Sequence, residues 1–472
     1  MSEPTLSRHL AAFADATRHQ PLPAEVAASV RDRVLDVLGL CLAGRALDTS
    51  AAALAYVREQ GGAGQAHVIG DAERVPAALA ALANGVLAHS LDYDDTHLPS
   101  VLHPSASVVP AALAAAEAAG TDGKALLAAV AAGLEVCVRL GMAGYDKEAK
   151  NSTFFEHGQH ATSICGAIGG AVAAAMLLGL DEDGITDVIG VSASMASGVI
   201  EANRTGGTVK RLHCGWAAHA AVSAAQLVKH GFTGPPTVLE GRFGFFEAFL
   251  RGEYDPAEIT GGLGEEWAVP GIFFKPYPAN HFTHTIVDAG RALREQGVDP
   301  DEVEALTVGV PAPVVRTVGE PIERKRRPAT PYEAQFSGPY AAAVGLFGGS
   351  GLGAAYADYD TGLLAEPRRL RLLSVTDVTA DDECTAIFPY QFPAVLRART
   401  ADGREWTAKA LVNRGGPQRP LSTDELRAKF RDNADGVLTP EAVRAVEECV
   451  AGLGGGSRPD ELLALVRPEG TR

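Results

Sequence analysis

A short stretch between two alanine-rich segments gathers carboxylates, a hydroxyl group and imidazoles. Residues 91–105 contain Asp92, Thr96 and His103, with Asp94 and Asp95 beside them. Imidazole and carboxylate groups are the usual side chains for moving protons near neutral pH, and loops between helices commonly carry catalytic residues. The stretch therefore predicts acid/base chemistry, with an aspartate as a base or as the group that orients a histidine. The alternative is that these residues only cap helices.

Two histidines with HxxH spacing, His157 and His160, precede a long apolar segment. Together with Asp94, Asp95 and His97 they raise the alternative of metal-assisted chemistry. No third ligand stands at a defined spacing from the pair, so we expect no metal. At the start of a helix the dipole disfavours an imidazolium, which makes His160 a candidate proton acceptor.

Basic side chains stand beside glycine or proline at two further places. Lys210 and Arg211 follow paired glycines, which let a backbone approach a ligand closely. Lys275 lies in a proline-stiffened segment that continues to His281 and His284. If these cations converge with His103 and His160, they form a pocket for the carboxylates of a small anionic substrate.

Composition limits the partners of the chain. The formal net charge is −17, which argues against nucleic acid because phosphate binding needs clustered Lys and Arg. None of the six cysteines forms a CxxC pair, so neither zinc nor an iron–sulfur cluster is indicated. The first residues lack the features of a signal peptide. We expect a cytoplasmic protein with no membrane partner and no cofactor.

Apolar residues at helical spacing fill the first 230 residues. The predicted helices are 6–17, 24–42, 51–60, 76–89, 105–119, 123–141, 160–178, 182–198 and 213–230. Farther along, the pattern predicts helices 283–296 and 332–347, a strand 303–310, a hairpin of 394–399 with 405–412, and tail helices 423–433 and 440–453.

The predicted fold is mainly α with an α+β second domain. Glycines at 261–264 and the prolines that follow mark the boundary. We expect an all-helical domain over 1–265, completed by C-terminal helices within 415–460. The α+β domain, a smaller lid, is expected over 270–412.

The motifs, in order and spacing over nearly the whole chain, resemble the MmgE/PrpD family. This family includes 2-methylcitrate dehydratase, cis-aconitate decarboxylase and an iminodisuccinate epimerase. The segments that carry the resemblance are 88–96, 103–105, 160–162, 209–215, 231–235, 241–246, 275–278, 416–421 and 429–430. The resemblance implies a large helical domain, a smaller lid, a homodimer, and a site between the domains that uses neither metal nor organic cofactor.

Carried over by motif, the resemblance implies these site residues: Asp92, Thr96, His103, His160, Lys210 and Lys275. As further substrate-binding candidates we add Tyr93, Arg211, Asn280, His281 and His284. The two lysines would stabilise the charge of an aci-carboxylate. The histidines at 103 and 160 would be base and acid in an order that the sequence leaves open. Asp92 would orient an imidazole, and Thr96 would hydrogen-bond the substrate.

The chain departs from the family at one place. In the decarboxylases a histidine lies five residues after the lysine of the lid, whereas here Asn280 holds that position and His281 follows. Many dehydratase-like members carry Cys-Arg at these two positions. This chain therefore matches neither subgroup. From its acid/base groups and lysines we predict a cofactor-independent lyase of the hydratase or dehydratase type, acting at the carbon α to a carboxylate of a small di- or tricarboxylate. The alternatives are a dicarboxylate epimerase, a decarboxylase, and an inactive binding protein of the same fold.

Overall fold

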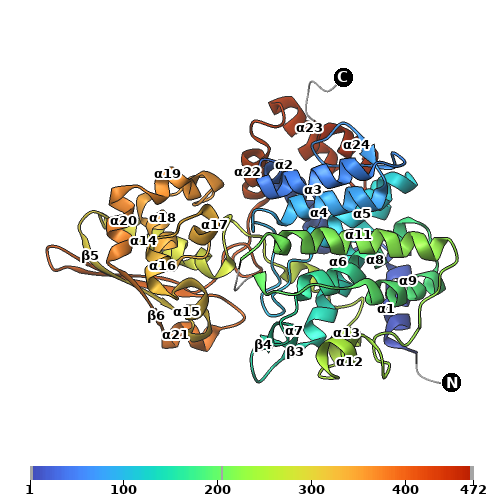
Figure 1. The fold of residues 1–472 in the computed structure, drawn as a ribbon, viewed down its shortest axis with the longest axis horizontal. Helices are drawn as coiled ribbons and strands as arrows, with labels where there is room; N and C mark the ends of the chain where they lie inside the picture. The colour runs from blue at the N-terminus through green and yellow to red at the C-terminus, as the bar shows by residue number, and fades with distance from the viewer. Residues whose placement is uncertain (1–3, 203–205, 468–472) are drawn as a thin grey trace. The chain divides into compact units, whose positions relative to one another are not determined.

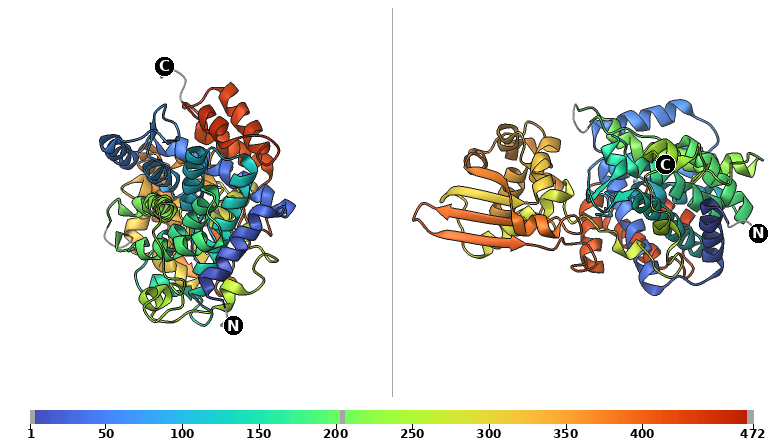
Figure 2. Two further views of the ribbon diagram at one scale, coloured as in Figure 1. Left: turned by 90° about the vertical axis from the view of Figure 1, so that its right-hand side faces the viewer. Right: turned by 90° about the horizontal axis from the view of Figure 1, so that it is seen from below.

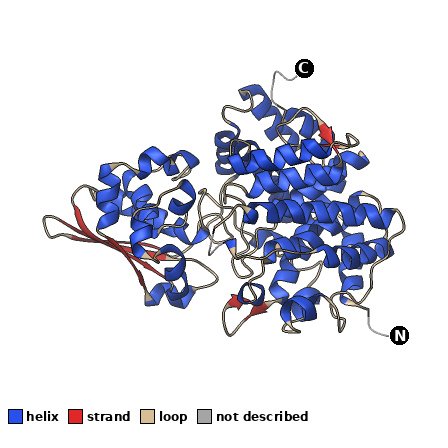
Figure 3. Cartoon of the chain, viewed as in Figure 1, coloured by secondary structure: helices blue, strands red, loops and turns tan. Residues whose placement is uncertain are grey.

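Helices account for most of the chain, and the computed structural model describes residues 4–202 and 206–467 (Figure 3). The chain divides into two units, Met1–Ile272 with Phe430–Arg472, and Phe273–Lys429. Among the described residues, every sheet of more than two strands lies in the second unit. The predicted fold class, mainly α with an α+β second domain, is confirmed.

The second unit extends farther toward the C-terminus than the predicted limit of 412. Phe274 packs in one apolar cluster with Leu421 and Leu426. Arg414 forms an ion pair with Glu425 in the same region. These contacts hold residues 415–429 to the second unit, whereas the sequence analysis assigned them to the first domain.

Helices packed side by side form the core of the first unit (Figure 1). They are α4 (Ala77–His89), α5 (Ser105–Ala119), α6 (Gly123–Ala143), α8 (Ala161–Leu177) and α11 (Val209–Lys229). Glycines allow the backbones to approach. A Cβ on Gly133 of α6 would lie 2.6 Å from the carbonyl oxygen of Gly169 in α8. A Cβ on Gly85 of α4 would lie 2.7 Å from Cα of Gly215 in α11. The glycines thus allow α6 to pack closely on α8, and α4 on α11.

Other helices surround this core: α1 (Leu6–His19), α2 (Ala24–Gly44), α3 (Asp48–Gln60), α9 (Glu182–Met195), α23 (Pro440–Ala451) and α24 (Pro459–Leu465). Most bounds lie within three residues of the prediction, but α11 begins four residues earlier than expected. Among the described residues, α6 has the length and hydropathy of a membrane span. Of its most apolar 18-residue stretch, 89% is buried inside the protein. Such burial is the property of a core helix.

The second unit contains a four-stranded sheet with the order β6-β5-β7-β8. The central strand β5 (Val303–Val310) has the predicted bounds, runs parallel to β6 (Thr376–Ala380) and antiparallel to β7 (Ala394–Thr400). β7 forms the predicted hairpin with β8 (Glu405–Ala410). The helices α14 (His284–Glu295) and α18 (Gly338–Phe347) pack on each other and against this sheet (Figure 2).

The prediction of one continuous helix over 332–347 is wrong in its first part. It is divided into α17 (Pro331–Ala334) and α18. Ser337 caps α18 by accepting a hydrogen bond from the N–H of Tyr340, and Pro339 stands in the first turn. Proline has no N–H to donate and is favoured in the first turn of a helix, so Pro339 together with the Ser337 cap favours the start of α18 here.

Candidate active site

Asp95 anchors the loop between α4 and α5. Its carboxylate lies 2.6 Å from the Arg33 guanidinium, and it accepts hydrogen bonds from the hydroxyl and the N–H of Ser105. Arg33 also donates to the carbonyls of Val269 and Ile272. These contacts of the Asp95 carboxylate join the loop to α2 (Ala24–Gly44) and to the start of α5. We therefore assign Asp95 a structural role rather than that of a base.

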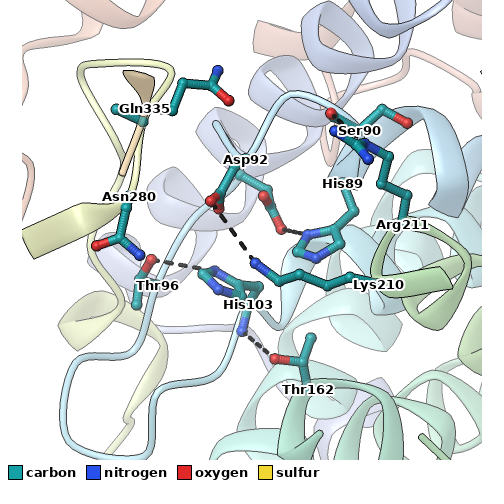
Figure 4. A network of polar contacts seen from close by, with 12 residues as sticks. His89, Ser90, Asp92, Thr96, His103, Thr162, Lys210, Arg211, Asn280 and Gln335 are labelled. Atoms are coloured by element: carbon teal, nitrogen blue, oxygen red, sulfur yellow. Dashed lines mark hydrogen bonds and ion pairs between the residues drawn. The ribbon is translucent and has the colours of Figure 1, made fainter. Parts of the chain in front are cut away.

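His103 is held in one tautomer by this loop. Its Nδ1 lies 2.7 Å from the carbonyl oxygen of Asp95 and 3.3 Å from Oγ1 of Thr96 (Figure 4). A carbonyl oxygen can only accept, so Nδ1 carries the hydrogen. The backbone N–H of His103 also donates a hydrogen bond to Oγ1 of Thr162. In the neutral imidazole the lone pair is therefore on Nε2, as a general base requires.

His160 forms a hydrogen bond with a second histidine. It stands at the start of α8, and its Nδ1 lies 2.8 Å from Nδ1 of His213 in α11. Burial, with the nearby His213, lowers the pKa of His160 well below its usual value. Burial likewise lowers the pKa of His213 to about 4. Both imidazoles are consequently neutral at neutral pH.

A fourth imidazole, that of His89, lies near both His103 and His160. Nδ1 of His89, the last residue of α4, lies 2.7 Å from Oδ2 of Asp94, and both side chains are buried. The His89 ring is 5.3 Å from the ring of His103 and 6.0 Å from the ring of His160, measured between centroids. Four histidines thus form one contiguous cluster in the first unit.

Lys210 supplies positive charge to the cluster. Its Nζ lies 3.8 Å from Oδ2 of Asp92, whose backbone adopts a φ of 51° (Figure 4). The Lys210 charge also contributes to the lowered pKa of His160 and of His213. A cation that disfavours imidazolium keeps the histidines neutral while it attracts an anionic ligand.

The structure therefore brings together the predicted residues of the first unit: Asp92, Thr96, His103, His160 and Lys210. Two substrate-binding candidates nearby have other contacts. Arg211 donates from Nε to the carbonyl of Ser90 at 3.2 Å. Tyr93 packs in a small apolar cluster with Leu40 and Leu91.

The remaining predicted residues lie in the second unit. Lys275 is buried, and Asn280 accepts a hydrogen bond from the N–H of Phe282 at the start of a short 3₁₀ helix. His284 donates from Nε2 to the carbonyl of Ala279, and its ring lies 4.5 Å from the ring of His281. The roles of these residues in the chemistry stay predictions.

The groups of the metal alternative contact different partners. His157 pairs through Nδ1 with the carbonyl of Phe249, and His97 pairs with Ser100. Within residues 4–202 and 206–467, the ligand atoms close enough to share an ion, within 4.8 Å of one another, belong to His89, Asp94 and Cys214. Burial raises the pKa of the Cys214 thiol well above its usual value.

Sequence reasoning did not nominate His89 or His213. Lys210 and His213 are three residues apart on one helix, a spacing that places them on the same face. The predicted helix began at 213, so this relationship was hidden. His89 ends α4, where its pairing with Asp94 depends on the path of the loop.

Known families and relatives match most of the chain. The model of the MmgE/PrpD N-terminal domain matches residues 8–257, and that of the MmgE/PrpD C-terminal domain matches residues 277–454. The cis-aconitate decarboxylase-like protein oryM of Aspergillus oryzae is 28% identical over 95% of this chain and 94% of its own length. The cis-aconitate decarboxylase of Homo sapiens is 30% identical over 80% of this chain and 77% of its own length. That of Mus musculus is 29% identical over 79% and 75%.

Proposed function

Because the chain belongs to the MmgE/PrpD family, we propose that it is a cofactor-independent lyase acting on a small di- or tricarboxylate. The proposed reaction removes a proton from the carbon next to a carboxylate and expels a hydroxyl group as water. The observation that carries this proposal is the cluster of four histidines beside the Lys210 cation, in which burial keeps His160 and His213 neutral.

His103 is the proposed base. Its Nε2 lone pair accepts the proton, and the C–H electron pair moves into the adjacent carboxylate to give an aci-carboxylate with one more negative charge. Lys210 offsets this charge, an effect worth about 3–4 kcal/mol when a preorganised donor acts away from water. As the charge returns to form a carbon–carbon double bond, the C–O bond breaks and His160 donates its ring proton to the departing hydroxyl. The proton that His103 took up then restores the hydrogen of His160, so both rings end neutral.

Decarboxylation is the second candidate, and the names of the relatives favour it. In that case a C–C bond breaks, carbon dioxide leaves, and the electron pair left on carbon takes a proton from a ring N–H of the histidine cluster, which solvent then replaces. The same cluster serves both reactions because each needs a proton-transfer group beside a cation. Asn280, in place of the histidine expected of a decarboxylase, is the departure that ranks decarboxylation below dehydration, although the Cys-Arg of dehydratase-like members is absent as well.

Proton NMR in deuterated water with a panel of di- and tricarboxylates tests the proposal. We expect one substrate to exchange a C–H for deuterium and to lose water. Loss of carbon dioxide would favour the second candidate, and inversion without loss would indicate an epimerase. If no panel member exchanges deuterium, loses a group or inverts, the proposed function is wrong, and binding without turnover would point to a binding protein.

A chelation arm addresses the metal alternative. After exhaustive dialysis against EDTA we expect turnover to be unchanged, because proton transfer by imidazoles and charge stabilisation by Lys210 need no ion. Activity that disappears on chelation and returns with one added metal would contradict the cofactor-independent mechanism.

A further inference from the structure

The contact between His160 and His213 joins two like atoms. Nδ1 lies opposite Nδ1 at 2.8 Å, so a hydrogen bond requires a hydrogen on one nitrogen and a lone pair on the other. Since burial keeps both rings neutral at neutral pH, the two histidines must be opposite tautomers. One ring then carries its hydrogen on Nδ1, and the other carries its hydrogen on Nε2.

Backbone contacts hold the two histidines beside each other. The backbone N–H of His160 donates to the carbonyl of Gly198, and Oγ of Ser163 in the first turn of α8 donates to the carbonyl of His213. Helices α8 and α11 are therefore joined at the position of the imidazole pair. The rings are 4.8 Å apart between centroids, and both residues are buried.

We propose that His213 is a positioning residue that donates its Nδ1–H to His160 and thereby holds His160 as the Nε2–H tautomer. The inference rests on the proposed function, in which His103 is the base and a second group must supply a proton. With His213 as the donor, the neutral His160 presents an N–H to the substrate. In the opposite arrangement His160 would present a lone pair, and the cluster would contain two bases and no acid.

Nitrogen-15 NMR of histidine-labelled protein at pH 7 tests this assignment directly. The shifts of the two ring nitrogens distinguish a protonated from an unprotonated nitrogen. We expect His160 to show an unprotonated Nδ1 and a protonated Nε2, with the reverse pattern for His213. A His160 that carries its hydrogen on Nδ1 would overturn the inference.

Two variants of equal size sharpen the test. In His213→Asn the amide N–H takes the place of Nδ1–H, so we expect His160 to keep the Nε2–H tautomer and turnover to stay within about tenfold. In His213→Asp the carboxylate only accepts, so we expect the hydrogen to move to Nδ1 of His160 and kcat to fall about 10²-fold or more. Equal turnover and equal tautomers in the two variants would contradict a positioning role.

A control on the same helix separates this effect from packing. His219 also lies on α11, where its Nδ1 faces the carbonyl of Ala78. We expect His219→Asn to leave both the His160 spectrum and kcat unchanged. If the spectra show the expected tautomers but no carboxylate exchanges deuterium, the proposed function fails and the assignment of His213 stands. If deuterium exchanges but His160 has the other tautomer, only the assignment fails.

Discussion

His89 and Asp94 form a buried imidazole–carboxylate pair at the centre of the candidate site, with 2.7 Å between Nδ1 and Oδ2. An ionised carboxylate can only accept, so the hydrogen is on Nδ1 of His89. A carboxylate that binds one imidazole nitrogen fixes both the tautomer and the orientation of the ring. Through this pair, the loop after α4 fixes the hydrogen of His89 on Nδ1 and leaves the lone pair of the neutral ring on Nε2. The neighbouring rings are those of His103 and His160.

Replacing Asp94 by alanine should therefore destabilise the protein. The variant leaves the Nδ1–H of His89 buried without its acceptor, at a cost of about 1–3 kcal/mol in the free energy of unfolding. Urea titration followed by circular dichroism measures the change. Asp301→Ala, which breaks an exposed pair with Arg368, is the control and should leave the midpoint where it is. Equal midpoints for the two variants would show that the pair is not structural.

The buried ion pair of Arg33 with Asp95 gives a larger effect. Arg33→Met leaves a carboxylate buried without its cation and removes the donor to the carbonyls of Val269 and Ile272, at a cost of about 3–5 kcal/mol. Adding Asp95→Asn to this variant should recover part of the loss, because the uncompensated charge is gone. A double variant no more stable than Arg33→Met in urea would refute this explanation.

A third prediction concerns Lys210. Lys210→Met should lower kcat/KM about 10²- to 10³-fold, because the developing negative charge loses its cation. Methionine keeps the apolar stem of the largely buried lysine, and the 3.8 Å contact with Asp92 is longer than the 2.6 Å Arg33–Asp95 pair, so the melting temperature should fall much less than in Arg33→Met. Lys229→Met, at the exposed end of the same helix, is the matched control for the deuterium-exchange assay. Full activity in Lys210→Met would remove Lys210 from the mechanism.

The residues of the site that could be predicted are those whose local sequence is distinctive. Asp92, Thr96 and His103 stand in one short polar stretch between apolar segments, and helical periodicity placed the helices on both sides. The strand β5 was predictable because four of its eight residues, Val303, Thr307, Val308 and Val310, are β-branched. The neighbouring strand β6 was not, because its sequence, Thr376–Ala380, is short and largely polar.

The pairings within the site depend on tertiary structure. Nothing in the local sequence of His160 indicates that it meets His213, which is 53 residues away. Their contact requires α8 and α11 to pack closely, and this depends on small residues distributed over both helices. The structural role of Asp95 is hidden for the same reason, since its partner Arg33 lies 62 residues earlier. The local sequence does not distinguish the roles of the neighbouring carboxylates Asp92, Asp94 and Asp95. Only the fold shows that Asp95 binds Arg33 whereas Asp92 lies beside Lys210.

The lowered histidine pKa values predict how stability depends on pH. Burial lowers the pKa of both His213 and His97 from 6.5 to about 4. Between these two pH values the unfolded chain binds protons that the folded protein does not, so stability rises with pH across this window and falls as the solution is acidified. Each histidine should contribute up to about one proton to the slope of the unfolding free energy against pH. Urea titrations between pH 4 and 7 measure this slope, and His97→Asn should reduce it by the share of one histidine. A slope that stays the same in His97→Asn would mean that His97 binds its proton equally well in the folded and unfolded protein.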